Sequence, residues 1–441
     1  MFRNPIATHG MTTAGGRRKI LLVNASSSTG GAAKAALRLY CAMQQAGRYD
    51  LAWMSNEPSP VVDGGLYPRA ADSVAGRVCG FLRMVRRRGL ERLRPMTSLA
   101  GDLRFDYGSS FAAADVLDAV PDCDLVHLNW VSGLIDPATV ARIATGRAPV
   151  LWTLHDMAPL TGGCHFDGGC GGFVDGCHGC PQLGGLPGFD YTGRRLRLKQ
   201  QEFGRIPEGR LHLVSPSRWL ALEAERSSLF RGRPVHVIPN TIDLDLFRPR
   251  DRARARHRFG LPPRAPVVLF VARKFANRRK GAHLLAPIVE RIRAVLPDVT
   301  VVLAGSGIDR RAFPFDHRDL GDITDEDQLA DVYSLADVTL IPSLQDNLPN
   351  VMIESMACGV PVAAFAVGGV PDLVTDGRTG VLAPPGDVDG LANAVVALLG
   401  DREFRAAAPG HCRVAIEKDC CPRRQSEKYS RLYEQMIEAA R

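Results

Sequence analysis

One local pattern occurs near the start of the chain and begins again in its second half: an apolar strand, a glycine-containing turn and a helix. The first copy is "RRKILLVNAS" followed by "SSSTGGAAKAALRLYCAMQQAG". The second begins with "APVVLFVAR" and continues with "VTVVLAGSG", "ADVTLIPS" and "VPVAAFA", with helical stretches between them. Apolar strands that alternate with helices are typical of parallel sheets covered on both faces. The sequence therefore predicts two doubly wound α/β domains.

The domain boundaries follow from the same pattern. A chain of 441 residues is too long for one ordinary core, and the proline-containing stretch near residues 239–250 is the predicted linker. We expect a disordered leader over residues 1–17, an N-terminal domain over 18–243 and a C-terminal domain over 244–422. An amphipathic helix over 423–441 is expected to pack back on the N-terminal domain. Ligands in such folds bind beyond the carboxyl ends of strands, so the site is expected in a cleft between the domains.

Composition excludes several classes of protein. The chain is 45% hydrophobic and 23% charged, and its N-terminus lacks the apolar segment of a signal peptide. There is no uncharged apolar run of about 18 residues, so we expect a cytoplasmic protein without a transmembrane helix. Fifty-five Lys and Arg against 47 Asp and Glu leave a net charge of +8, which suits an anionic substrate or membrane surface. No signature of RNA or DNA binding accompanies this charge, so no nucleic-acid partner is expected.

Two common nucleotide-binding motifs are missing. A dinucleotide-binding oxidoreductase needs G-x-G-x-x-G after the first strand, whereas the first turn offers only Gly30 and Gly31. The stretch "GSGIDR" lacks the third glycine, and no G-x-x-x-x-G-K-[ST] motif occurs. These absences argue against a dehydrogenase and against a P-loop nucleotidase.

Charged residues gather instead where the second domain's strands are expected to end. "ARKFANRRKG" places Arg273 and Lys280 after a strand, where basic groups and free backbone N–H groups can bind a diphosphate; a solvated basic loop is the alternative. "LQDNLPNVMIESMACG" places Asp346 before a short helix and Glu354 within it. Two carboxylates near a phosphate repel it, so they should face hydroxyl groups. A ligand with both phosphates and hydroxyls is a nucleotide sugar.

These motifs resemble those of family-4 retaining glycosyltransferases of the GT-B fold, and the resemblance extends over about residues 18–441. The family's pair of acids with seven residues between them reads Asp346 and Glu354 here, with Asp in place of the usual first Glu. The resemblance implies two Rossmann-like domains facing a central cleft, transfer of a sugar from a nucleotide-diphosphate sugar with retention, and no catalytic metal. Two other interpretations stay open: a catalytically silent nucleotide-sugar binding protein, and an epimerase or phosphorylase on the same fold.

The resemblance also implies roles for individual residues. Glu354 would bind the ribose hydroxyls, while Asp346 with the backbone of Asn347 and Leu348 would bind the transferred sugar. Arg273 and Lys280 correspond to the residues that bind the diphosphate. In the first domain, His155 of "TLHD" corresponds to the histidine beside the donor sugar at the reaction centre. The remaining donor-binding positions are Ile323 near the nucleobase, and Gly30 and Gly31 in the N-terminal glycine loop.

A glycine-rich loop over residues 162–182 contains four of the eleven cysteines, Cys164, Cys170, Cys177 and Cys180. A cytosolic protein disfavours disulfides, and clustered thiols that end in C-x2-C favour a structural zinc ion. Reduced thiols and a redox-sensitive pair are the alternatives. A similar loop occurs in exopolysaccharide glycosyltransferases of the colanic acid type. This resemblance implies that the loop takes part in acceptor binding, and we expect a glycan or polyprenyl-linked acceptor in surface polysaccharide synthesis.

One further segment concerns localisation. "FLRMVRRRGLERLR", residues 81–94, contains six Arg and one Glu among apolar residues. A basic amphipathic helix can lie on an anionic membrane surface, which would make the protein peripheral at the inner face of the membrane. A solvated helix face explains the pattern equally well.

Overall fold

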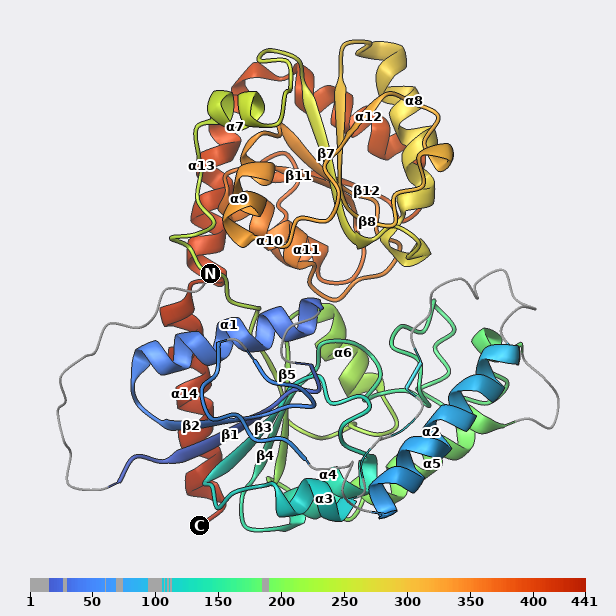
Figure 1. Cartoon of the computed structure of the whole chain (residues 1–441), viewed down its shortest axis with the longest axis vertical. Helices are drawn as coiled ribbons and strands as arrows, with labels where there is room; N and C mark the ends of the chain where they lie inside the picture. Colours follow the sequence, from blue (N-terminus) through green and yellow to red (C-terminus); the bar gives the residue numbers. More distant parts are fainter. Residues whose placement is uncertain are drawn as a thin grey trace. The chain divides into compact units, whose positions relative to one another are not determined.

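The structure is a computed structural model that describes residues 16–26, 30–59, 61–68, 74–93, 105–106, 108, 111, 113–184 and 190–441. The leader expected over residues 1–17 lies almost entirely outside these ranges. The chain divides into two compact units: in Figure 1 the N-terminal unit is coloured from blue to green with the red C-terminal helix added, and the C-terminal unit from green to red. The C-terminal unit comprises Asn240–Pro422. The N-terminal unit comprises the described residues up to Pro239 together with Arg423–Arg441.

The N-terminal unit contains a parallel sheet of six strands in the order β2-β1-β3-β4-β5-β6. Strands β1, β3 and β4 lie next to one another and are almost wholly buried, as their apolar sequences predict. The strands are β1 (Lys19–Val23), β2 (Asp50–Met54), β3 (Leu125–Leu128), β4 (Val150–Thr153), β5 (Leu211–Ser215) and β6 (Val235–Val237). The helices are α1 (Gly31–Ala46), α2 (Val74–Leu93), α3 (Ala113–Asp118), α4 (Pro137–Thr145), α5 (Tyr191–Phe203) and α6 (Arg218–Arg226).

The last helix, α14 (Pro422–Ala439), also packs on this sheet. Its Tyr433 hydroxyl lies 2.7 Å from Nδ1 of His127, a fully buried residue of β3. The other ring nitrogen of His127 lies 2.8 Å from the Thr153 hydroxyl on β4. Burial lowers the pKa of His127 to about 3, so the ring is neutral and both of its polar atoms are paired. These buried hydrogen bonds fix the C-terminal helix to the N-terminal sheet.

The C-terminal unit contains a second parallel sheet of six strands in the order β12-β11-β10-β7-β8-β9. The strands are β7 (Val267–Lys274), β8 (Thr300–Ser306), β9 (His317–Asp319), β10 (Val338–Ile341), β11 (Val362–Phe365) and β12 (Gly380–Ala383). The α-helices are α7 (Arg252–Arg258), α8 (Leu285–Val295), α9 (Glu326–Ser334), α10 (Asn350–Ala357), α11 (Val370–Leu373), α12 (Val388–Gly400) and α13 (Arg402–Asp419). The change of direction in strand order falls between β7 and β10, which is where such sheets bind ligands.

The prediction of two doubly wound α/β domains is therefore confirmed. Each sheet has its own buried core, and helices lie on both faces of the sheet in each unit (Figure 1). Aspartates cap several helices. For example, Asp136 Oδ1 accepts a 2.7 Å hydrogen bond from the Thr139 amide at the start of α4. Within the described ranges, no helix is both long and apolar enough to cross a bilayer.

Candidate functional site

In the C-terminal unit, a buried carboxylate is paired with two cations beyond the carboxyl ends of β7 and β10. Asp346 Oδ2 accepts a hydrogen bond from the Lys280 ammonium, and Asp346 Oδ1 lies 3.3 Å from Arg279 Nη1. Burial alone would raise the pKa of Asp346, but Lys280 and Arg279 together hold it below its ordinary value. The carboxylate is therefore ionised at neutral pH. Two predicted site residues, Lys280 and Asp346, are in direct contact.

Close backbone approaches bring these loops together. Gly281 has a left-handed φ of 76°, and a Cβ there would collide with the carbonyl oxygen of Pro342. Gly368 has a φ of 54°, and a Cβ there would collide with the carbonyl oxygen of Asp346. Only glycine satisfies both conditions at these positions. The turn that follows β7 can therefore lie directly against the loop that follows β10.

Glu354, the second predicted acid, is also buried. It lies on α10, and its Oε2 accepts a 2.8 Å hydrogen bond from the hydroxyl of Tyr333 on α9. Asn347 and Leu348 are buried in the loop between Asp346 and this helix. The Asn347 carbonyl accepts a 2.7 Å hydrogen bond from the Gly369 amide, which fixes the loop before α10.

The other two predicted residues of this unit lie at the same edge of the sheet. Arg273 is exposed near the end of β7. Ile323 is partly buried against the core, in the loop between β9 and α9. The amide of Gly305 in β8 donates a 2.7 Å hydrogen bond to Gly321 of that loop. Strand β8 pairs in parallel with both β7 and β9, so Arg273 near the end of β7 and Ile323 after β9 lie at the carboxyl edge of the sheet.

The remaining predicted residues belong to the N-terminal unit. Gly30, with φ 108°, immediately precedes α1, and Gly31 begins that helix. His155 follows β4 and is partly buried, with Nε2 3.3 Å from Oδ1 of Asn129, which follows β3. Burial lowers the pKa of His155 to about 4, although the neighbouring Asp156 opposes this shift. His155 is therefore a neutral imidazole at pH 7, and its hydrogen bond to the Asn129 oxygen places the ring proton on Nε2.

Asp156, next to His155 in the sequence, holds three groups. Its Oδ2 accepts hydrogen bonds from Trp130 Nε1 at 2.8 Å and from His165 Nδ1 at 2.7 Å. Its Oδ1 accepts one from the Ala158 amide at 2.9 Å. Burial opposes ionisation, yet His165 and these hydrogen bonds keep the pKa of Asp156 below its ordinary value. This buried carboxylate ties the glycine-rich loop, through His165, to the strand end that bears His155.

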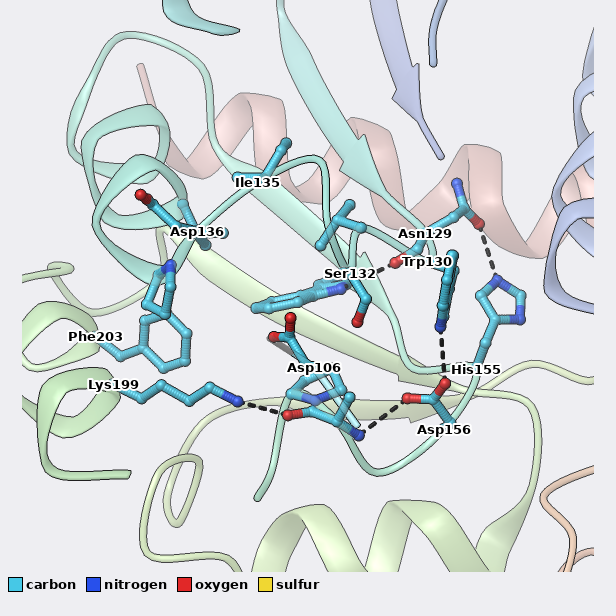
Figure 2. A pocket seen from close by; sticks show the side chains of 16 residues that line it. Asp106, Asn129, Trp130, Ser132, Ile135, Asp136, His155, Asp156, Lys199 and Phe203 are labelled. Atoms are coloured by element: carbon cyan, nitrogen blue, oxygen red, sulfur yellow. Dashed lines mark hydrogen bonds between the residues drawn. The ribbon is translucent and has the colours of Figure 1, made fainter. Parts of the chain in front are cut away.

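A pocket opens beside this network (Figure 2). Together with the open solvent space at its mouth, it spans about 440 Å³ that no protein atom fills. Lys199 of α5 lines it, with its ammonium donating to the carbonyl groups of Ala158 and, at 2.8 Å, of Thr161. Burial lowers the pKa of Lys199 to about 8. The lining residues comprise Asp106, Asn129, Trp130, Val131, Ser132, Ile135, Asp136, Pro137, Val140, Trp152, His155, Asp156, Ala158, Pro159, Lys199 and Phe203.

The four cysteines of the glycine-rich loop do not form a metal site in the structure. They are free thiols, and no three His, Cys, Asp or Glu side chains in the described ranges are arranged to hold a metal ion. Cys164 instead packs against Phe105 and Leu183, and the Gly162 amide donates to the Cys177 sulfur at 3.3 Å. Burial raises the pKa of Cys177 to about 11, so it is protonated at neutral pH. The zinc set of Cys164, Cys170, Cys177 and Cys180 therefore stays a prediction.

Three residues of these sites were not predicted from the sequence. Arg279 belongs to the same basic run as Lys280, but the sequence of the run does not show which side chain turns toward Asp346. Tyr333 had no local signal, since it precedes Glu354 by 21 residues on another helix. Asn129 in "VHLNW" was detectable as a polar residue at the end of an apolar strand.

Comparison with known families supports a glycosyltransferase domain in the C-terminal unit. The family described as glycosyl transferases group 1 matches residues 265–401. The D-inositol 3-phosphate glycosyltransferase of Mycobacterium sp. (strain KMS) is 39% identical over 209 residues, which are 43% of this chain and 46% of that protein. The D-inositol 3-phosphate glycosyltransferase 2 of Catenulispora acidiphila is 38% identical over 185 residues, 38% of this chain and 43% of that protein. The chain spans less than half the length of these curated relatives.

Solved structures match nearly the whole chain. Sucrose-phosphate synthase from Thermosynechococcus elongatus has a TM-score of 0.68 at 22% identity, over 96% of this chain and 100% of that one. HepE of Anabaena, solved with UDP and glucose, has a TM-score of 0.64 at 17% identity, over 95% and 100%. At these identities the likeness shows the fold alone. The predicted class, GT-B with two Rossmann-like domains, is confirmed.

Proposed function

We propose that this chain is a retaining glycosyltransferase that moves a hexosyl group from a nucleotide-diphosphate sugar to a hydroxyl group of a glycan or polyprenyl-linked acceptor in surface polysaccharide synthesis. The observation that carries this proposal is the contact of Lys280 and Arg279 with buried Asp346, at the ligand-binding edge of a parallel sheet. The contact lies within the segment that matches group 1 glycosyl transferases. Cations for a diphosphate and a carboxylate for hydroxyl groups are thus adjacent.

On the donor side, Lys280 and Arg273 bind the diphosphate. An ammonium group has three donors, so the ion pair of Lys280 with Asp346 still allows a hydrogen bond to a phosphate oxygen. Glu354 accepts hydrogen bonds from the ribose, and the Tyr333 hydroxyl orients its carboxylate. Asp346 binds hydroxyl groups of the transferred sugar with the backbone of Asn347 and Leu348; Ile323, Gly30 and Gly31 complete the donor set.

During transfer, the bond between the anomeric carbon and the diphosphate oxygen breaks. The acceptor oxygen bonds to the same face of that carbon, and the acceptor's proton passes to the departing diphosphate. Lys280 and Arg273 stabilise the negative charge that develops on the diphosphate. His155 acts at the reaction centre as a neutral hydrogen-bonding group, since its pKa of about 4 keeps it unprotonated.

On the acceptor side, the pocket beside His155 is better suited to an uncharged hydroxyl-bearing ring than to a phosphate. Its carboxylates include Asp106, which is paired with Arg195 at 3.0 Å, and Asp156, which is paired with His165. Lys199, the cation among its described lining residues, already donates to two carbonyl groups. The curated relatives reported above are D-inositol 3-phosphate glycosyltransferases. D-inositol 3-phosphate is therefore the alternative acceptor.

A panel of UDP-, GDP- and ADP-sugars, incubated with a soluble glycan, a lipid-linked acceptor or D-inositol 3-phosphate, tests this proposal. We expect one nucleotide sugar to be consumed with formation of a glycosylated acceptor of retained anomeric configuration. If product forms with D-inositol 3-phosphate but with neither the soluble glycan nor the lipid-linked acceptor, the acceptor assignment is contradicted. Nucleotide-sugar binding without transfer to any acceptor would favour a catalytically silent binding protein, and inversion would contradict the mechanism.

A further inference from the structure

Helix α2 in the N-terminal unit carries a concentration of exposed apolar side chains. Six of the thirteen large apolar side chains that are exposed in the described part of the chain lie on this helix, with Val74 69% and Phe81 60% exposed. The six are Val74, Val78, Phe81, Leu82, Met84 and Val85. Single exposed apolar residues are ordinary on protein surfaces, but a contiguous set marks an interaction site.

The positions of these residues place them on one side of the helix. Val74, Val78, Phe81 and Val85 follow one another at intervals of four, three and four residues, which is the spacing of a single helical stripe. Leu82 and Met84 flank this stripe on either side, so the apolar arc covers about 160° at about 100° per residue.

The opposite side of the helix is turned toward the unit. Arg83 lies nine residues after Val74, which places it half a turn away from the stripe. Its guanidinium covers Gly133, where an added Cβ would collide with it. The helix therefore contacts the unit on the Arg83 side, and the apolar stripe points outward; Figure 1 shows α2 on the outside of the N-terminal unit.

Strong positive charge accompanies the stripe. Within Val74–Leu93 the sequence has six Arg and one Glu, a net charge of +5 (6 − 1). Arg77 and Arg88 are exposed and fall on the same side as the apolar stripe. The first turn contains no acidic residue. We call Val74, Val78, Phe81, Leu82, Met84 and Val85 with Arg77 and Arg88 the α2 surface.

We propose that the α2 surface docks the protein on a lipid bilayer that contains anionic lipids. The wide apolar arc enters the boundary between head groups and acyl chains, while the arginines contact lipid phosphates with their stems lying along the apolar surface. A nucleic acid complements the charge but not the apolar arc. This inference goes beyond the proposed transfer reaction and does not depend on it, because none of these residues belongs to the proposed donor or acceptor sites.

Vesicle flotation tests the proposal with the full chain. We expect binding to vesicles of phosphatidylcholine mixed with phosphatidylglycerol, little binding to phosphatidylcholine alone, and weakening as salt rises. The double variants V78S/F81S and R77Q/R88Q should each bind anionic vesicles on the order of tenfold more weakly. V295S, at a position 61% exposed on α8, and R147Q, at the exposed Arg147, are matched controls that should bind as the wild type does.

Each contrary outcome overturns the proposal. These are no binding to anionic vesicles, equal binding to both vesicle types, or wild-type binding by both α2 variants. Association of the protein with itself in light scattering, abolished by V78S/F81S without vesicles, would identify a second copy as the occupant instead. Circular dichroism checks that all variants fold. Transfer to a soluble acceptor should be unchanged in the α2 variants, so the docking proposal and the proposed reaction fail separately.

Discussion

The candidate sites of the two units differ in the charge of their central groups. In the C-terminal unit, Asp346 is ionised and pairs with Lys280 and Arg279, so the edge of the sheet offers full charges of both signs. In the N-terminal unit, His155 is neutral, and its proton is directed to the neutral Asn129 amide. Charged groups of the pocket beside His155 are paired with each other, as Asp106 is with Arg195.

The difference has a physical consequence. Lys280 and Arg279 share the single carboxylate of Asp346, so the edge of this sheet carries an excess of positive charge that a diphosphate can neutralise. A neutral, hydrogen-bonded centre suits hydroxyl groups, which would interact poorly with unpaired ions. We therefore expect the C-terminal unit to bind the sugar diphosphate and the N-terminal unit to bind an uncharged acceptor.

Replacing His155 should have the largest effect on transfer. In the H155A variant we expect kcat to fall by about 100-fold or more, comparable to the loss of a single well-placed hydrogen-bond donor in other enzymes. Donor affinity, measured by calorimetry with the nucleotide sugar, should change little, because the proposed donor-binding side chains belong mostly to the C-terminal unit. H236A, on edge strand β6, is the control and should keep full activity. Equal losses in kcat and donor affinity would remove His155 from the reaction centre.

Glu354 offers the corresponding test in the other unit. Hydrogen bonds to a charged group are worth about 1.5–3 kcal/mol, so E354A should weaken donor binding about 10- to 150-fold. Y333F keeps the carboxylate and removes only the hydroxyl that orients it, so its effect should be smaller. Calorimetry with the nucleoside diphosphate measures both. Unchanged affinity in E354A would show that the ribose binds elsewhere.

A substitution of Asp346 distinguishes sugar binding from diphosphate binding. D346N keeps the shape of the side chain but removes the charge that Lys280 and Arg279 share. We expect transfer to fall about tenfold or more, from the loss of charged hydrogen bonds to the sugar. Affinity for the nucleoside diphosphate without a sugar should stay the same or rise, because Lys280 then no longer shares its charge with a carboxylate. A large loss of diphosphate affinity would mean that Asp346 positions the cations rather than binding the sugar.

The same contrast explains how far the sequence alone could predict these sites. Lys280, Asp346 and Glu354 follow buried strands or sit on the next short helix, so strand pattern and spacing were enough to single them out. Their contacts depend on non-local features such as the approach of Gly281 to Pro342, which no local pattern encodes. The fold was predictable for the same reason as the site positions, because every core strand is an apolar run.

Contacts between segments that are distant in the sequence could not be predicted from the sequence. His155 meets Asn129, 26 residues earlier, because β3 and β4 are neighbours in register, and sequence order alone does not fix that pairing. The spacing of four cysteines likewise does not show how their side chains are arranged, so the zinc set stays a prediction. The sequence indicates an amphipathic helix here, but only the structure shows that six apolar side chains of α2 are exposed.

The smallest expected effect is that of pH on transfer. A transfer rate without an inflection near neutral pH would show that His155 is neutral there. Because burial lowers the pKa of His155 to about 4, the ring should stay neutral from pH 8 to about 5, and transfer should show no inflection near the ordinary value of about 6.5. The folded pKa lies below the unfolded one, so the unfolded chain binds the proton first. Stability contributed by neutral His155 is complete above about pH 6.5 and declines as the pH falls toward 4.

Nuclear magnetic resonance of histidine-labelled protein measures this pKa directly, with H155Q identifying the signal. N129D provides the matched perturbation, since it replaces the neutral oxygen 3.3 Å from Nε2 by a carboxylate. A negative charge at that distance favours the imidazolium and should raise the pKa of His155. The N-terminal centre would then acquire charge as the C-terminal one has, and transfer should become dependent on pH near neutrality. If wild-type His155 titrates near 6.5, the contrast between a neutral and a charged unit fails.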